Sequence, residues 1–111
     1  MYILGGDIDM LIKYAGEDFN NLISEGLVLV DFFATWCGPC RMIGPHLESL
    51  ASNRDDVKVI MIDVDQYRDL AVEYQVSSIP SLVLLKDGKI ISRRTGFASE
   101  NQLTKWIDDN K

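Results

Sequence analysis

Both cysteines of this chain lie in one short segment, Trp36-Cys37-Gly38-Pro39-Cys40, which separates two different apolar patterns. The residues directly before it, 27–33, are branched or aromatic apart from Asp31, and a short run that is apolar on both faces is typical of an interior strand. Directly after it, apolar side chains follow helical spacing between Met42 and Ala51. The cysteine pair is therefore predicted to lie where a buried strand ends and a helix begins.

Strand and helix patterns alternate along the rest of the chain. Pro45 predicts a kink in the helix that follows the cysteines, because proline bends a helix axis, and Gly26 predicts the end of an earlier helix. Asp87-Gly88 between two strand patterns indicates a hairpin, and Ser99 and Gln102 have capping-box spacing. Strands are predicted over residues 10–14, 27–33, 57–64, 81–85 and 90–94, and helices around 19–23, from about 37 to 53, over 67–74 and after Ser99.

These elements predict an α/β fold. Strands that are joined through crossover helices pair in parallel, whereas the two strands of a hairpin pair antiparallel. We therefore expect a mixed sheet that is covered by helices on both faces. A chain of 111 residues suits one domain with one hydrophobic core. We assign the domain to residues 10–111 and treat residues 1–9 as an N-terminal extension without an assigned role.

Charge and hydropathy narrow the possible functions. Eleven basic and seventeen acidic residues give a net charge of −6, which argues against nucleic acid or an anionic membrane as the main partner. No apolar run approaches the roughly 20 residues that span a bilayer. The first twelve residues lack a basic start, and glycine and aspartate interrupt their apolar positions, so we do not expect a signal peptide. We expect a cytoplasmic protein, where a close cysteine pair is more often catalytic or metal-binding than structural.

The spacing of the cysteines favours thiol–disulfide exchange. A disulfide between Cys37 and Cys40 closes a small ring, which removes little entropy from the unfolded chain and is a poor staple. Cys37 at a helix N-terminus would have its thiolate stabilised by the helix dipole and free N–H groups, so we expect it to attack target disulfides. Cys40, one turn further, is expected to resolve the mixed disulfide. A zinc site is disfavoured because zinc usually needs four ligands and His46 is the only histidine.

Three more positions are candidate functional residues. Asp31 interrupts the apolar strand, and a carboxyl in a dry core can exchange protons, so it could accept a proton from Cys40; the alternative is a strand-edge aspartate that touches solvent. Ile79-Pro80 leads into a strand, and a cis bond would suit that tight turn, although only about 5–6% of X–Pro bonds are cis. His46 is expected to be a partly buried helix residue without a catalytic role.

In the motifs described above, the chain resembles the thioredoxin family, and the resemblance extends over about residues 10–111. The segment from Trp36 to Cys40 has the form of that family's active site, and Val30-Asp31-Phe32 puts an acid where the family has its buried aspartate. Ile79-Pro80 looks like the family's cis-proline element. Arg94-Thr95-Gly96-Phe97 resembles its late glycine loop, and Pro45 matches its helix kink.

The resemblance implies a five-stranded mixed sheet flanked by four helices. It implies a general protein disulfide reductase that holds no bound cofactor or metal beyond its own disulfide. A thioredoxin reductase would restore the dithiol with electrons from NADPH, and a monomer is the default. By similarity, an extended target segment would be bound like an added strand. The residues that would contact it are Trp36, Gly38, Pro39, Ile79, Pro80 and Gly96.

Three positions depart from the family pattern. Phe33 stands where many members have a second tryptophan, and His46 replaces an aliphatic residue. Met61 stands where bacterial members often have a lysine near the buried aspartate. Because that cation would favour the ionised carboxylate, its loss predicts a higher Asp31 pKa than in a lysine-containing relative.

Two other functions remain as alternatives. An oxidase or isomerase of the same fold would use the same cysteines, but Gly38-Pro39 between them favours a reductase. A binding module could instead use the apolar surface around Trp36 and Pro80 as a subunit contact that does not depend on redox state. Full biological function in a Cys37→Ser/Cys40→Ser double variant would show that redox chemistry is not the main role.

Overall fold

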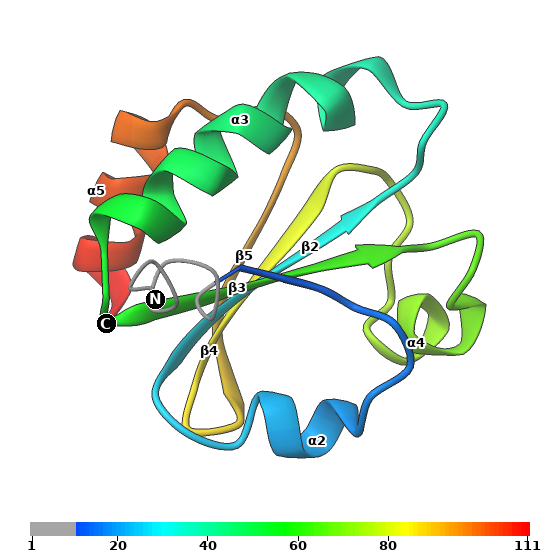
Figure 1. Ribbon diagram of the computed structural model, residues 1–111, viewed down its shortest axis with the longest axis horizontal. Helices are drawn as coiled ribbons and strands as arrows, with labels where there is room; N and C mark the ends of the chain where they lie inside the picture. The colour runs from blue at the N-terminus through cyan, green and yellow to red at the C-terminus, as the bar shows by residue number, and fades with distance from the viewer. Residues whose placement is uncertain (1–10) are drawn as a thin grey trace, which may run out of the picture.

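The computed structural model describes residues 11–111, which contain five strands and four helices (Figure 1). The predicted extension over residues 1–9 lies outside the described residues, and so does Met10, where we expected the first strand to begin. The strands are β1 (Leu11–Lys13), β2 (Leu27–Phe33), β3 (Val57–Asp63), β4 (Ser81–Lys86) and β5 (Lys89–Thr95). The helices are α2 (Phe19–Leu22), α3 (Gly38–Asn53), α4 (Arg68–Glu73) and α5 (Glu100–Asn110).

The five strands form one mixed sheet in the order β1-β3-β2-β4-β5. β2 is central and pairs in parallel with β3 and antiparallel with β4. β1 also pairs in parallel with β3, and β4 and β5 form the predicted antiparallel hairpin. Asp87 and Gly88 make its two-residue turn with φ values of 52° and 84°, a left-handed conformation that glycine adopts without strain. The predicted mixed sheet is therefore confirmed.

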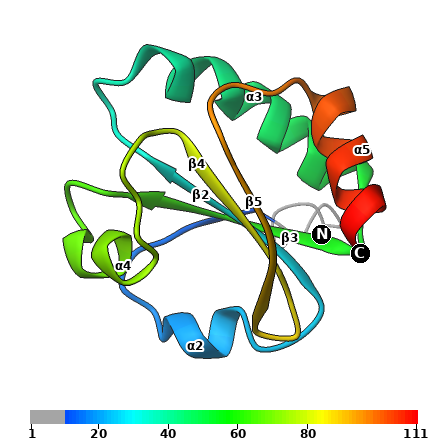
Figure 2. The ribbon, with the colours of Figure 1, turned by 180° about the vertical axis from the view of Figure 1, so that it is seen from behind.

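Helices cover both faces of this sheet (Figures 1 and 2). α3 and α5 lie on one face, where Leu29 of β2 packs with Leu47 of α3 and Leu103 of α5. α2 and α4 lie on the other face, where the alternate β2 residues Val28 and Val30 face outward from the sheet. β2 is thus buried on both sides, which explains why its sequence is apolar at successive positions.

Most predicted elements agree with the structure to within one or two residues. Ser99 and Gln102 form a complete capping box at the start of α5. Pro45 lies inside α3, as predicted. The predicted end of the first helix was wrong in position, because α2 ends at Leu22 and Gly26 lies in the following turn. There the Gly26 amide donates to the Asp87 carboxylate, so Gly26 fixes the turn rather than the helix end.

No helix within residues 11–111 has both the length and the apolar character that crossing a membrane would require.

Candidate active site

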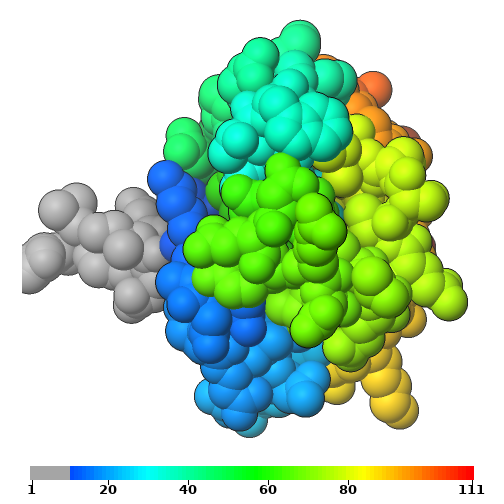
Figure 3. Space-filling view, turned by 90° about the vertical axis from the view of Figure 1, so that its right-hand side faces the viewer, coloured from blue at the N-terminus to red at the C-terminus, as the bar shows by residue number. Residues whose placement is uncertain are grey.

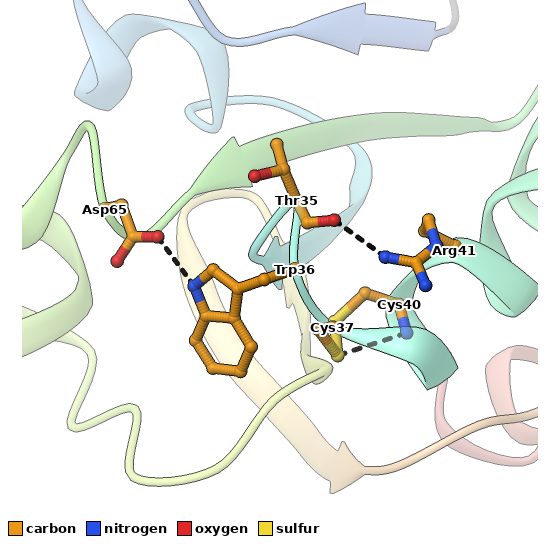
Figure 4. Close-up of a disulfide and its surroundings, with 6 residues drawn as sticks. All are labelled: Thr35, Trp36, Cys37, Cys40, Arg41 and Asp65. Carbon is orange, nitrogen blue, oxygen red and sulfur yellow. Dashed lines mark hydrogen bonds between the residues drawn. A yellow bond between two sulfur atoms is a disulfide. The ribbon is translucent and has the colours of Figure 1, made fainter.

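The two cysteines form a disulfide at the N-terminal end of α3 (Figure 4). Cys37 is the N-cap residue of the helix, and its sulfur accepts a hydrogen bond from the Cys40 amide at 3.2 Å. The two Cα atoms are 5.2 Å apart. Both side chains are nearly buried, with 5% of Cys37 and 4% of Cys40 exposed. The predicted strand–helix junction is therefore confirmed, and the sulfur of Cys37 occupies the position where a helix stabilises negative charge.

Local sequence explains why the helix begins at this point. Pro39 occupies the first turn, where its missing N–H removes no intrahelical hydrogen bond and its fixed φ suits a helix. A Cβ atom built on Gly38 would meet no atom within 4 Å, so the chain itself does not require glycine there. The lack of a side chain at Gly38 instead leaves the surface beside the disulfide open.

Trp36 presents an apolar surface next to the cysteines. Its side chain is 67% exposed, and its Nε1 donates a hydrogen bond of 2.9 Å to Oδ2 of Asp65 (Figure 4). Asp65 lies just beyond β3, so the ends of two parallel neighbouring strands bring the pair together. On the other side of the disulfide, the Arg41 guanidinium donates to the Thr35 carbonyl at 2.9 Å. These two bonds fix the loop that precedes the helix.

Asp31 lies beneath this loop, in the interior of the sheet. It is fully buried, and neither of its carboxyl oxygens has a hydrogen-bond partner among residues 11–111. Its strand neighbours are Met61 of β3 and Leu82 of β4, so no cation offsets its charge there. Burial accordingly raises the pKa of the Asp31 carboxyl from its ordinary 3.8 to about 7. The strand-edge alternative for Asp31 is excluded, because the residue is buried in the central strand.

A hollow of about 270 Å³ lies next to Cys40. Its lining includes Cys40, Phe33 and Met61, and Met61 is the register partner of Asp31. By strand alternation Asp31 shares a sheet face with Leu29 and Phe33, the face that α3 covers. Cys40 and the Asp31 carboxyl thus lie on the same side of the sheet, Cys40 in the helix and Asp31 in the strand.

The turn at Ile79 and Pro80 borders the disulfide from another side. The peptide bond between Ile79 and Pro80 is cis. Ile79 packs against the cluster that contains both cysteines. The Gly96 amide donates to the Pro80 carbonyl at 2.8 Å, and Gly96 has a φ of 86°. Figure 3 shows this end of the molecule, with the turquoise segment that carries the cysteines above the green α4 region and next to the yellow-green chain that leads into β4.

Sequence reasoning did not identify three contacts around the site. The Asp65 bond to Trp36 could have been suspected, because β2 and β3 end at the same edge of the sheet. His46 is half-buried as expected, but its Nδ1 also accepts a bond of 3.1 Å from the Glu100 amide at the start of α5. Its ring packs edge-on against Phe97 at 5.3 Å. No sequence signal specified these His46 contacts, because they join α3 to residues more than 50 positions further along the chain.

Among residues 11–111, no three His, Cys, Asp or Glu side chains lie together in a way that could hold a metal ion. The sequence model of the thioredoxin family matches residues 10–109 of the chain. The chain belongs to the thioredoxin family. The family's five-stranded sheet and helix arrangement is the one described above.

Individual relatives agree with this assignment. Thioredoxin from Chlamydia trachomatis is 45% identical over 95 residues, which cover 86% of this chain and 93% of the relative. Thioredoxin from Staphylococcus epidermidis is 41% identical and covers 88% of this chain and 95% of its own length. Among solved structures, an N21Q mutant thioredoxin from Halobacterium salinarum NRC-1 superposes with a TM-score of 0.79 at 36% identity, covering 91% of this chain and 88% of its own.

A second solved chain comes from work on thiol resolution in yeast mitochondrial 1-Cys peroxiredoxin through the glutathione and thioredoxin systems. It is 40% identical, with a TM-score of 0.77, and covers 90% of this chain and 93% of its own. Together, membership of the thioredoxin family and the disulfide at the start of α3 identify the chain as a thiol–disulfide oxidoreductase with a redox-active cysteine pair.

Proposed function

We propose that this protein is a general protein disulfide reductase in which Cys37 attacks the target and Cys40 resolves the mixed disulfide. The observation that carries this proposal is the position of Cys37 as the N-cap of α3, with its sulfur accepting the Cys40 amide hydrogen bond. When the disulfide is reduced, the same amide and the helix dipole favour a thiolate on Cys37. Cys40, which lies within the helix, lacks that advantage.

The first step joins the protein to its target. The Cys37 thiolate attacks one sulfur of the target disulfide, so a Cys37–target S–S bond forms while the target's own S–S bond breaks. The leaving target sulfur departs as a thiolate and takes a proton from solvent. The open surface at Gly38 and the small exposed fraction of Cys37 support an approach from outside the molecule.

The second step releases the reduced target. Cys40 loses its proton to Asp31, directly or through water, and attacks the Cys37 sulfur. The Cys37–Cys40 bond forms and the Cys37–target bond breaks, and the target sulfur leaves as a thiolate that takes up a proton. Two electrons have then passed to the target. A carboxyl with a pKa of about 7 suits this proton transfer because it is present in both protonation states near neutral pH. The hollow between Cys40 and Met61 supports a proton path between helix and sheet.

Target binding would occur on the surface around the disulfide. The exposed indole of Trp36 offers apolar contact, and the backbone near Ile79 offers hydrogen-bonding groups to an extended segment. Main-chain bonds carry little sequence information, which would allow many targets. The substrate-binding residues in this proposal are Trp36, Gly38, Pro39, Ile79, Pro80 and Gly96.

Electrons would return to the pair from a thioredoxin reductase that uses NADPH, a partner suggested by membership of the family. We place the reaction in the cytoplasm, where thiols are kept reduced, and expect the protein to act as a monomer. The domain that carries this activity would extend over residues 10–111, of which the family model matches 10–109.

A coupled assay tests the proposal. The purified protein is mixed with NADPH, a bacterial thioredoxin reductase and a protein that contains exposed disulfides, and NADPH consumption is followed. We expect catalytic consumption that depends on this protein. If the reductase assay stays at background while a glutathione buffer readily reduces the Cys37–Cys40 disulfide, the oxidase alternative replaces this proposal.

A further inference from the structure

A polar hollow of about 430 Å³ lies beside the proposed target-binding surface, at the edge of the sheet. It is formed where the start of β4 and the end of β5 meet the segment that follows α4. Ser81 and Thr95 are paired across the two strands, and Ser81 directly follows Pro80. The residues that line the hollow are Gln75, Ser77, Ser81, Arg93, Arg94 and Thr95.

Arg93 supplies the positive charge of this hollow. Successive strand residues point to opposite faces, and the Arg94 guanidinium lies 5.6 Å from the Trp106 ring centroid, on the α5 face. The Arg93 side chain is on the α4 face, where its Nη2 donates to the Tyr74 carbonyl. That bond uses one of five guanidinium N–H donors and leaves the others available to an anion.

Arg93 has no charged partner within the described part of the chain. The ion pairs among residues 11–111 involve only the cations Arg54, Lys105 and Lys111. Glu73, next to Tyr74, is exposed and makes no ion pair with Arg93. The hollow that Arg93 lines is also lined by three hydroxyl side chains and an amide, and together with the guanidinium they offer hydrogen-bond donors that suit a carboxylate.

The position of the hollow indicates where this carboxylate would come from. The Gly96 amide bonds to the Pro80 carbonyl at 2.8 Å, so the end of β5 is attached to the segment that would hold the target backbone. Arg93 lies two residues before Thr95, or about 7 Å along the strand at roughly 3.4 Å per residue. An extended target segment has the same rise per residue, so two or three positions of a target that is bound beside Gly96 and Pro80 would span the distance from this attachment to Arg93.

We propose that this hollow, with Arg93 as its cation, binds an acidic side chain located within about three residues of a target's reactive cysteine. The inference rests on the proposed reductase function and adds a preference among its targets. The protein as a whole has a net charge of −6 and repels acidic segments. A single basic hollow therefore favours the alignment of a bound target that brings its acidic side chain to this hollow over alignments that bring the acid elsewhere.

The test uses pairs of short disulfide peptides as substrates. In each pair a single Glu, or Gln in its place, occupies one position within three residues on either side of the reactive cysteine. With reductase and NADPH present, we expect kcat/KM at one or more positions to be about fivefold higher for the Glu peptide at low salt. The preference should shrink in 1 M salt, because ionic screening weakens exposed charge pairs.

Three variants separate the hollow from general charge effects. Arg93→Gln should lower kcat/KM for the Glu peptides to the value for the matching Gln peptides, which abolishes the preference. Lys89→Gln removes the same charge from the opposite end of β5 and should retain the preference. Arg93→Lys keeps the positive charge but lacks the planar guanidinium group, so it should retain part of the preference. This variant also tests the hollow if Arg93→Gln does not fold.

Two results would overturn this inference: equal rates for Glu and Gln peptides at every position, or a preference that survives in folded Arg93→Gln. Both are distinct from failure of the reductase proposal, in which the Gln peptides would not be reduced either.

Discussion

At its C-terminal end, α3 is held by charged and amide side chains that bind one another. Arg54 bonds both oxygens of Asp56 and also contacts Asp108 of α5 at 2.9 Å. At its N-terminal end, the buried Asp31 carboxyl beneath the helix has no partner within residues 11–111, and the helix is capped by the sulfur of Cys37. The C-terminal end of α3 therefore carries paired charges. Its N-terminal end carries the disulfide, and the sheet below that end holds the unpaired Asp31 carboxyl.

The difference shows how stability and chemistry are divided along one element. Paired carboxylates at the C-terminal end have lowered pKa values, because Arg54 favours their charged form. The unpaired carboxyl at the N-terminal end has a raised pKa, because burial disfavours its charge. The first arrangement stabilises the fold at neutral pH. The second destabilises the fold there and supplies the carboxyl that we propose as the proton acceptor for Cys40.

The largest effect is expected on turnover. Cys40→Ser should abolish multiple-turnover reduction of a protein disulfide, because the mixed disulfide on Cys37 can no longer be resolved from within the chain. Ser49→Ala, in the same helix but at the stable end, should retain the wild-type rate. Multiple turnover by Cys40→Ser in the NADPH-coupled assay would contradict this division.

The next effect concerns stability and pH. The folded state holds the Asp31 proton up to a pH of about 7, whereas the unfolded state releases it near 3.8. Stability from this group is thus complete below pH 3.8 and is lost as the pH rises through 7. At 1.36 kcal/mol per pKa unit, the loss amounts to about 4 kcal/mol by pH 8.

Asp31→Asn removes this titration. Urea unfolding should show that the variant is more stable than wild type by up to about 4 kcal/mol at pH 8, and similar to it near pH 4. A constant difference between the two proteins across this range would mean that Asp31 does not titrate as the fold predicts.

Met61→Lys should reduce the contrast between the two ends of α3. A cation at the register partner of Asp31 favours the ionised carboxyl, and we expect the Asp31 pKa to fall by about 1. Carbon-13 NMR titration of the Asp31 carboxyl measures this directly, with Met61→Gln as the uncharged control. An unchanged pKa on adding the lysine would show that position 61 does not control the acid.

The smallest effect is expected at the C-terminal end. Arg54→Met should lower the free energy of unfolding by about 1 kcal/mol at pH 7, because its carboxylate partners are partly exposed and screened. Because the pKa values of Asp56 and Asp108 are lowered, this contribution is present above the ordinary aspartate pKa and is lost as the pH falls through the lowered values. Urea unfolding at pH 7 and pH 3 checks the sign, which is opposite to that of Asp31, and reductase activity should not change.

Sequence patterns predicted the fold well because its elements depend on local signals. β2 is apolar on both faces because both faces are buried, and the Asp87-Gly88 turn adopts the φ values that these residues favour. The end of α2 was mispredicted because Gly26 serves the turn into β2, where it bonds to Asp87 across 61 residues. A local glycine signal does not distinguish these two roles.

The candidate site was predictable where the residues are adjacent in sequence and less so where tertiary contacts complete it. Cys37 and Cys40 follow from their spacing, and the burial of Asp31 follows from its apolar neighbours. The Asp65 contact with Trp36 and the His46 contact with the start of α5 depend on how distant elements pack. The hollow around Arg93 also escaped notice, although strand alternation separates Arg93 from Arg94 in the sequence itself.

The most direct test of the central claim, that the two cysteines have different roles, is covalent trapping. Cys40→Ser and Cys37→Ser proteins are each incubated, in reduced form, with a target that contains a disulfide, and the products are identified by intact mass and peptide mapping. The asymmetric geometry predicts a stable mixed disulfide through Cys37 in the Cys40→Ser protein and little or none through Cys40 in the Cys37→Ser protein. Trapping through Cys40 in preference to Cys37 would contradict it.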